Sequence, residues 1–572
     1  MAEKKWVENK YSDEEFSNIM SRSSFTRPIV AALAGRNVQA DDLDCYCNAT
    51  LKNLSSPYRI PGTEKASKRI WEAIKNDEDI LIHGDFDVDG ITASAVLSWI
   101  LTQNGANVST FIPHRIDTGY GFTPDSLHLS LSKYKCNLLI TVDCGITSND
   151  AVTSANELGI DTIITDHHEQ GEKLPDAYTI INTKLSPELS DLHCLAGVGV
   201  AFKLGHAFLK YGKEHDLLFH NVDLREILDL VALGTVADIV PLVGENRILT
   251  KYGIRLLAKQ IRPGIRALCE ISGVKDQLKS SDIAFKLAPH INAAGRLGDP
   301  NIAYKLLVTE SIVDAMQLAQ QLREYNLQRR AKEKEIFQEA ESQLLEKIKV
   351  NETSSILIYG AEWHQGVIGN VASRIARDYN RPSIVLTIIN GSAYGSGRSC
   401  SSINLVNILS ESSKILGRYG GHPMAVGLSL DPKDIKQLSE QFEKSVANVL
   451  DVEDLIPRIL YDGDIYLSEI NDDFFDNLLK LEPFGHSNLQ PIYRITNLSV
   501  PYKNLAGKEH TRGYVKDSLG YSFPFIAFNL KPDQLPAPPW NILTVPQINK
   551  FHNNSSPQLR IIDIKSVSDD IY

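Results

Sequence analysis

The sequence has few cysteines and no long apolar run. Its 572 residues include 7 cysteines, an odd number, and no two of them are spaced as a CxxC pair. This pattern argues against a disulfide framework, so we expect reduced thiols. No stretch approaches the roughly 20 apolar residues that a membrane helix needs, and the first residues, MAEKKWVENK, lack the apolar segment of a signal peptide. We therefore expect a cytoplasmic protein that contacts no membrane.

An excess of positive charge is also absent. The formal net charge is −12, whereas binding to nucleic acid normally requires a cationic surface that replaces the counterions of the phosphates. Net charge alone does not exclude such a partner, because metal-binding carboxylates count as negative until a cation occupies them. The local distribution of arginines therefore matters more than the total.

The region from Asp79 to about Lys184 has the pattern of an α/β domain. Short β-rich runs alternate with segments of helical period, which predicts a largely parallel sheet with helices on both faces. The expected strands are Ile80–His83, Leu138–Val142, Thr162–Thr165 and Thr179–Asn182, and the expected helices include Thr92–Asn104 and Ser148–Leu158. Ligands of such sheets lie outside the carboxyl ends of the strands, so the turns that follow the strands should converge on one crevice.

The chain is too long for a single hydrophobic core, so several domains are expected. A stretch without glycine or proline predicts one long connecting helix, and its basic part, Arg323 to Lys334, either faces DNA or is simply solvated. Short strands near the C-terminus fit a small antiparallel barrel. The expected order is residues 1–60 as a helical lead-in, 61–309 as the first α/β domain, 310–350 as the long helix, 351–452 as a second α/β domain and 453–572 as an OB-like barrel.

Acidic side chains follow the first two expected strands. Asp85, Asp87 and Asp89 alternate in HGDFDVDG, and Asp143 follows the next strand. In extended backbone the three alternating residues point to the same side. Their mutual repulsion is costly unless a cation neutralises them. One such acidic turn alone is as often a solvated loop.

Two histidines follow the third strand, in Asp166-His167-His168, and Asp238 lies in the apolar segment LGTVADIVP. Taken singly, the triplet is explained by a chance loop and Asp238 by a helix cap or an ion pair. Acidic or histidine turns after three successive strands favour a metal centre instead. Oxygen ligands combined with imidazole and no cysteine suit two divalent cations, Mn²⁺ or Mg²⁺. Such a pair catalyses displacement at phosphorus.

These motifs resemble those of the DHH phosphoesterase superfamily, whose members hydrolyse phosphoesters or phosphoanhydrides with two metal ions. HGDFDVDG, TVDCGI, TDHHE and ADIVPL match its four motifs. The resemblance implies that Asp87 and Asp143 bind one cation. The implied ligands of the other cation are Asp89, Asp143, His167 and Asp238. Asp85 would lie beside the first cation, either as a ligand or as a proton acceptor. His168 would face the scissile phosphate.

The second half of the chain resembles the RecJ exonucleases in particular. RYGGHPMAVG is similar to the glycine-rich signature of the DHH-associated domain, DHHA1, in which His422 would contact phosphate. IPHRIDTGYG, NAAGRLGDP, EWHQGVIG, GSGRS and LEPFGHSNLQPIY resemble RecJ segments. On this resemblance Tyr120 stacks on a base, and the pocket for a terminal 5′ phosphate is formed by Arg115, Arg296, Ser396 and Arg398. The chain departs from the RecJ pattern at Thr118, His290 and Val426.

The resemblance implies 5′-to-3′ hydrolysis of single-stranded DNA to 5′ mononucleotides, in DNA repair and recombination. It further implies a monomer with a RecQ-type helicase and a single-strand-binding protein as partners. Two alternatives remain open. One is a nanoRNase or cyclic-dinucleotide phosphodiesterase of the same superfamily, which would not need the barrel. The other is a non-catalytic DNA-binding scaffold of the eukaryotic Cdc45 type, which would not need the metal ligands.

Overall fold

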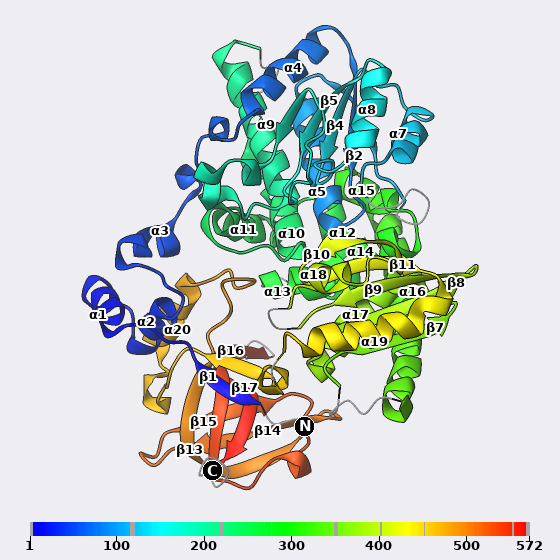
Figure 1. Ribbon diagram of the computed structural model, residues 1–572. Helices are drawn as coiled ribbons and strands as arrows, with labels where there is room; N and C mark the ends of the chain where they lie inside the picture. The colour runs from blue at the N-terminus through cyan, green and yellow to red at the C-terminus, as the bar shows by residue number, and fades with distance from the viewer. Residues whose placement is uncertain are drawn as a thin grey trace.

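The computed structural model describes residues 4–114, 121–217, 222–275, 277–347, 353–400, 403–450, 452–551 and 554–567. Figure 1 shows three folded bodies: the first α/β domain, the second α/β domain beside the long helix, and a C-terminal barrel. All 7 cysteines are free thiols. Among the helices of these residue ranges, none combines the length and the hydropathy needed to cross a bilayer.

The first domain contains a five-stranded parallel sheet in the order β3-β2-β4-β5-β6. Its strands are β2 (Asp79–Gly84), β3 (Asn107–Phe111), β4 (Leu138–Val142), β5 (Asp161–Thr165) and β6 (Thr179–Ile181). The predicted parallel sheet is confirmed. The edge strand β3 was not predicted, because its sequence, NVSTF, is polar and only partly buried.

Helices cover both faces of this sheet because its central strands are apolar on both sides. Ile82 and Ile140 pack in one core with α4 (Thr63–Lys75), α5 (Val88–Gln103) and α9 (Gly197–Glu214). Leu81 and Leu139 pack in another with α7 (Pro124–Leu131) and α8 (Asn149–Glu157). The remaining helices of the domain are α10 (Leu228–Ala237), α11 (Gly244–Leu257), α12 (Pro263–Ser272), α13 (Ser280–Asp282), α14 (Ala288–Leu297) and α15 (Asn301–Val308).

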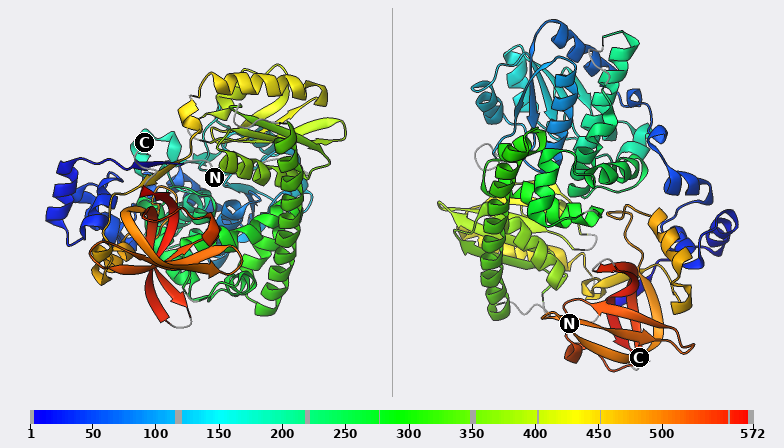
Figure 2. Two further views of the ribbon diagram at one scale, coloured as in Figure 1. Left: turned by 90° about the horizontal axis from the view of Figure 1, so that it is seen from below. Right: turned by 180° about the vertical axis from the view of Figure 1, so that it is seen from behind.

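The predicted long helix is confirmed as α16 (Ile312–Lys347). Its 36 residues span about 54 Å at the helical rise of about 1.5 Å per residue. One part of α16 packs against α12, α14 and α15 of the first domain, and another part packs against α17 and β7 of the second. The helix therefore runs along both domains, as Figure 2 shows from behind.

The second domain is built on a mixed sheet in the order β10-β11-β9-β8-β7, in which only β7 and β8 are parallel. One face packs on α17, which also contacts α16, and the other packs on α18 and α19. The elements are β7 (Ile356–Ala361), α17 (Gln365–Tyr379), β8 (Ser383–Ile389), β9 (Ser392–Arg398), α18 (Leu405–Ser410), β10 (Leu416–His422), β11 (Ala425–Leu430) and α19 (Ile435–Ala447).

The C-terminal body is a closed five-stranded barrel in the order β13-β14-β15-β17-β16, as expected for an OB-like domain. Trp540 and Phe525 are fully buried in its core. The strands are β13 (Tyr493–Ala506), β14 (His510–Lys516), β15 (Ser522–Ala527), β16 (Trp540–Phe551) and β17 (Asn554–Ser566). Before them come β12 (Arg458–Tyr461) and α20 (Asp472–Lys480).

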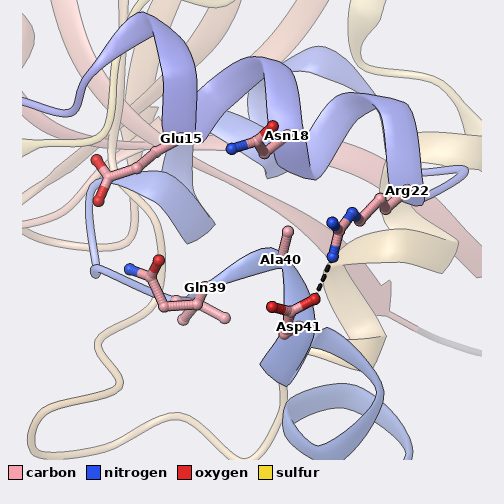
Figure 3. Close-up of a pocket in the computed structure, with 7 residues that line it drawn as sticks. Glu15, Asn18, Arg22, Gln39, Ala40 and Asp41 are labelled. Carbon is pink, nitrogen blue, oxygen red and sulfur yellow. Dashed lines mark hydrogen bonds and ion pairs between the residues drawn. The ribbon is translucent and has the colours of Figure 1, made fainter.

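The N-terminal segment is more than a helical lead-in, because it belongs to the C-terminal body. Its strand β1 (Lys5–Glu8) pairs in parallel with β12. Its helices α1 (Asp13–Arg22), α2 (Arg27–Ala34) and α3 (Leu43–Asn48) share a core with α20 and the barrel, and they lie beside these elements in Figures 1 and 2. A small polar pocket between α1 and the segment that precedes α3 is crossed by an ion pair of Arg22 with Asp41 (Figure 3). It contains none of the expected site residues.

A short segment after α20 attaches the barrel to the first domain. Arg247 of α11, only 3% exposed, donates hydrogen bonds to the carbonyl oxygens of Tyr46 (3.0 Å), Lys480 (3.1 Å), Leu481 (2.9 Å) and Glu482 (3.0 Å). Its guanidinium also lies 4.3 Å from the centre of the Tyr46 ring. The hydrogen bonds of the Arg247 guanidinium thus join α11 to α3 and to the segment at the end of α20.

We expect Arg247→Met to destabilise the attachment of the barrel. The substitution leaves buried carbonyl oxygens without a donor, at a cost of about 3 kcal/mol. Calorimetry should therefore show a lower melting temperature, and limited proteolysis should cut faster between the domains. Arg255→Met, at an exposed position of the same helix, is the control and should change neither. Equal behaviour of the two variants would contradict this role of Arg247.

Candidate metal centre and phosphate pocket

The first acidic turn is held by the start of α5. Asp87 is the N-cap of this helix, and its Oδ1 accepts hydrogen bonds from the backbone N–H groups of Asp89 (2.9 Å) and Gly90 (3.1 Å). A Cβ atom on Gly90 would lie 2.6 Å from the backbone nitrogen of Asp85. Glycine is therefore required for the turn to fold back on itself and bring the carboxylates together.

Asp143 follows β4 in a strained conformation. Its φ of 60° is in the left-handed region, which is costly for residues other than glycine. A Cβ atom on Gly197 would lie 2.4 Å from Oδ1 of Asp143, so the start of α9 approaches this carboxylate closely. The same helix start donates backbone hydrogen bonds from Gly197 (2.7 Å) and Val198 (2.8 Å) to the carboxylate of Asp89. One helix N-terminus thus supports two of the acidic groups.

Asp166 positions the two histidines that follow it. It is buried, and one carboxylate oxygen accepts the backbone N–H groups of His167 (2.8 Å) and His168 (3.1 Å). The same oxygen lies 2.7 Å from Nδ1 of His168, while the other accepts the N–H of Ile146 at 2.9 Å. The aspartate of the triplet therefore acts as a support, a role that the sequence pattern did not reveal.

The aspartates and histidines meet at the carboxyl end of the sheet. The Nε2 atom of His167 lies 3.2 Å from Oδ1 of Asp143, 3.6 Å from Oδ2 of Asp238 and 3.9 Å from Oδ2 of Asp89. Three groups have ligand-type atoms within 4.8 Å of one another: Asp143, His167 and His168; Asp89, His167 and Asp238; and Asp85, Asp87 and Asp143. The structure thus brings together every residue of the expected metal centre.

The pKa values of the carboxyl groups reflect this crowding. Burial and the charge of Asp87 raise the pKa of Asp89 to about 7, and burial and the charge of Asp89 raise the pKa of Asp238 to about 9. The same two causes hold the pKa of Asp143 well above its usual range. Burial lowers the pKa of His167 to about 3, which leaves this imidazole neutral and able to bind a cation.

The residues fit a pair of divalent cations. Oδ1 of Asp143 and Nε2 of His167 are buried without a hydrogen-bond partner among the described residues, although buried polar atoms normally have one. The remaining ligand-type atoms of the three groups are carboxylate oxygens and imidazole nitrogens, with no thiolate. Such a set suits Mn²⁺ or Mg²⁺.

His422 brings the second domain to this centre. It ends β10, and its ring lies 5.8 Å from that of His168 between centroids, with 21° between the planes. Burial opposes the charged form of His168, but its hydrogen bond with Asp166 raises the pKa of His168 to about 9. A protonated histidine therefore faces the second domain directly beside the acidic cluster.

Two arginines and a serine form a cationic pocket next to the cluster. Nη1 of Arg398 donates to Oγ of Ser396 at 2.8 Å, and Nη1 of Arg296 donates to the carbonyl oxygen of Gly366 at 2.9 Å. Within the described ranges, neither arginine is paired with a carboxylate. Burial and the charge of Arg296 lower the pKa of Arg398 to about 10. Two half-buried like charges that form no ion pair with a carboxylate among the described residues indicate a site for an anion.

Arg296, Ser396 and Arg398 thus lie near one another, and their role as a pocket for a terminal phosphate stays a prediction. Two further residues expected to contact nucleic acid, Arg115 and Tyr120, lie outside the described residues. Gly197 was not predicted from the sequence, although two glycines at the start of an apolar helical segment, Gly197 and Gly199, are a visible sign of close packing.

Three family models match the chain. The DHH family N-terminal domain matches residues 79–235, the DHHA1 domain residues 352–448 and the RecJ OB domain residues 461–563. The single-stranded-DNA-specific exonuclease RecJ of Bacillus subtilis is 33% identical over 568 residues, covering 98% of this chain and 70% of that protein. The RecJ of Salmonella typhimurium is 35% identical over 537 residues, covering 90% of this chain and 92% of that protein.

The chain belongs to the RecJ family. A solved RecJ from Thermus thermophilus in complex with Mn²⁺ superposes with a TM-score of 0.84 at 26% identity, over 98% of this chain and 79% of that one. A second RecJ structure, bound to manganese, superposes with a TM-score of 0.59 at 32% identity, over 70% of this chain and 99% of that one. The arrangement of two α/β domains along a long helix, followed by a C-terminal barrel, is therefore that of RecJ proteins.

We expect Asp143→Asn to abolish the stabilisation of the protein by Mn²⁺. A cation at about 100 times its Kd stabilises the native state by about 2.7 kcal/mol. The same substitution should raise the melting temperature of the metal-free protein, because it removes one of several repelling buried carboxylates. Thermal unfolding with and without Mn²⁺ measures both effects. Asp176→Asn, at an exposed position of the same domain, should behave as wild type, and a normal Mn²⁺ response of Asp143→Asn would contradict the assignment.

Proposed function

We propose that the chain hydrolyses single-stranded DNA from a 5′ end and releases 5′ mononucleotides, with two divalent cations, Mn²⁺ or Mg²⁺, in its acidic cluster. The observation that carries this proposal is a largely buried cluster of aspartates and histidines beside two arginines that form no ion pair with a carboxylate among the described residues. Family membership supports the single-stranded substrate, because the RecJ relatives are named single-stranded-DNA-specific exonucleases.

In this proposal Asp143 is the ligand that the two cations share. Asp87 completes the first site, next to Asp85. The residues proposed for the second site are Asp89, Asp143, His167 and Asp238. When bound, the two cations supply Lewis-acid stabilisation of the oxygens that enter and leave at phosphorus. The raised pKa values of the buried carboxyl groups support this, since a nearby cation favours their ionised form.

The other residues bind the substrate and move a proton. Asp85 would accept the proton of the attacking water. His168, kept protonated by Asp166, would donate a hydrogen bond to an oxygen of the scissile phosphate. Arg296, Ser396 and Arg398 would bind the terminal 5′ phosphate, with His422 closing the site from the second domain.

Selectivity for single strands would be steric. The two domains approach closely enough at the site for the rings of His168 and His422 to stack, so a base-paired end would have to open before it entered.

The barrel offers a surface for the rest of the DNA strand, outside the site. On its outer face Tyr502 of β13 is paired with Tyr514 of β14, both about half exposed, and exposed aromatic rings stack on bases regardless of sequence.

Two alternatives are less consistent with these features. A hydrolase of dinucleotides would need neither the barrel nor its exposed aromatic rings. A non-catalytic scaffold would not need a complete set of ligand residues at one point. A RecQ-type helicase and a single-strand-binding protein, acting with a cytoplasmic monomer, are consistent with the proposed activity because both deliver single strands.

We expect Mn²⁺-dependent degradation of a long 5′-phosphorylated single strand to mononucleotides. A blunt duplex should be resistant, chelator should stop the reaction, and Asp143→Asn should lower kcat by at least about a thousandfold because the shared ligand is lost. End-labelled substrates resolved on a gel measure product length and direction. A long strand left intact, with dinucleotides cleaved, would favour the small-substrate alternative.

We expect Arg398→Met to remove the preference for a 5′-phosphorylated end. A charge-assisted hydrogen bond is worth about 1.5–3 kcal/mol, so KM for a 5′-phosphorylated strand should rise about tenfold or more. KM for a 5′-hydroxyl strand should stay the same. Arg377→Met, at an exposed position of α17 in the same domain, should change neither value. An equal loss on both kinds of end would argue against terminal phosphate recognition.

A further inference from the structure

Lys184 lies at the metal centre but has no role in the mechanism above. It follows β6, the fifth strand in chain order to end at this edge of the sheet. Asn182, which is 2% exposed, accepts the backbone N–H of Lys184 through Oδ1 at 2.9 Å and donates from Nδ2 to the carbonyl oxygen of His168 at 2.9 Å. A buried side chain therefore fixes the backbone of Lys184 against the histidine turn.

Among the described residues, the ammonium group of Lys184 has one ion-pair partner, and this pair is weak. Its Nζ lies 3.0 Å from Oε1 of Glu169, and the Lys184 and Glu169 side chains are 27% and 70% exposed. An ion pair with so exposed a member contributes about 1 kcal/mol or less. A phosphate dianion or diester could replace Glu169 at little cost.

The charge of Lys184 acts on the metal centre and on the second domain. Burial is the main cause of the low pKa of His167 and of His422, and the charge of Lys184 lowers both pKa values further. Burial raises the pKa of Asp238, and Lys184 opposes this rise. Lys184 therefore lies within electrostatic reach of groups of both the first and the second domain.

Different cations act on different members of the acidic cluster. Arg296 interacts electrostatically with Asp87 and with Arg398. Lys184 instead interacts with Asp238 and His422. A strand whose terminal phosphate occupies the arginine pocket would cross the cluster and leave it beside Lys184.

We propose that Lys184 binds the phosphate that follows the scissile one on its 3′ side, so that it holds the part of the strand that remains after each cleavage. This inference rests on the proposed function. An ammonium on a flexible stem suits this task, because it binds phosphate as a point charge without fixing the geometry of the strand. Glu169 would hold the ammonium in place until DNA arrives.

The test compares Lys184→Met with wild type on 5′-phosphorylated oligonucleotides of different length. A 5′-phosphorylated dinucleotide has a terminal phosphate and one scissile phosphate, but none beyond it. Lys184→Met should therefore leave its KM and kcat unchanged. On a trinucleotide and on a long strand, KM should rise about tenfold with little change in kcat, and the slope of log KM against log salt concentration should fall by about 0.7.

Two further variants separate substrate binding from a structural role. Glu169→Gln removes the competing carboxylate and should not raise KM on any substrate. Lys173→Met, at an exposed position of the same domain, should behave as wild type. If Lys184→Met and Glu169→Gln raise KM alike, the pair is structural and the inference is wrong.

The length dependence identifies the phosphate concerned. Equal loss on the dinucleotide and the trinucleotide would overturn the inference, because Lys184 would then act at the scissile phosphate or at the metal centre. An unchanged KM of Lys184→Met on every length would overturn it as well. Wild-type enzyme that leaves the trinucleotide and the long strand intact would overturn the proposed function itself, a result that does not depend on any Lys184 variant.

Discussion

Mutual repulsion of buried carboxylates is the constraint on which the rest of this structure depends. Asp89 and Asp143 are almost fully buried, and the charge of Asp89 raises the pKa values of both Asp143 and Asp238. Folding therefore has to force these groups together, and the left-handed backbone of Asp143 is part of that cost. The close approach of Gly197 leaves the Asp143 carboxylate little room to relax. Divalent cations bound in the cluster would offset this repulsion, so the arrangement that favours cation binding also destabilises the metal-free protein.

The arrangement of positive charge follows from the same constraint. A polyanion approaches an acidic cluster only if cations surround it, yet a cation paired with a nearby carboxylate is not available to the substrate. The structure places positive charge near the cluster and keeps it available to a substrate, because Arg296 and Arg398 donate hydrogen bonds to a carbonyl and a hydroxyl oxygen. Lys184 retains only an exposed glutamate. A net charge of −12 is thus compatible with DNA binding, because the few cations that matter lie within the site.

The sequence allowed the site to be predicted better than the packing between domains. Asp87, Asp143 and His167 each follow a strand whose apolar run is visible locally, and parallel topology then requires that they converge. The N-terminal strand β1 could not be predicted, because its partner is β12, which lies far away in the sequence. A strand of four residues is also too short for its sequence pattern to indicate which strand it pairs with. Arg247 was equally hidden, because its partners are carbonyl oxygens, which every residue has.

The attachment of the barrel extends to the metal centre through one short loop. Asp238 ends α10, and four residues later the N–H of Leu242 donates to the carbonyl oxygen of His486 in the segment that Arg247 holds, at 2.9 Å. Between them Ile239 has a φ of 61°, a strained value for a β-branched residue. The loop is therefore fixed at both ends, by the first domain and by the barrel segment. The stretch from Asp238 to Leu242 thus connects the acidic cluster directly to the segment that joins the barrel to the first domain.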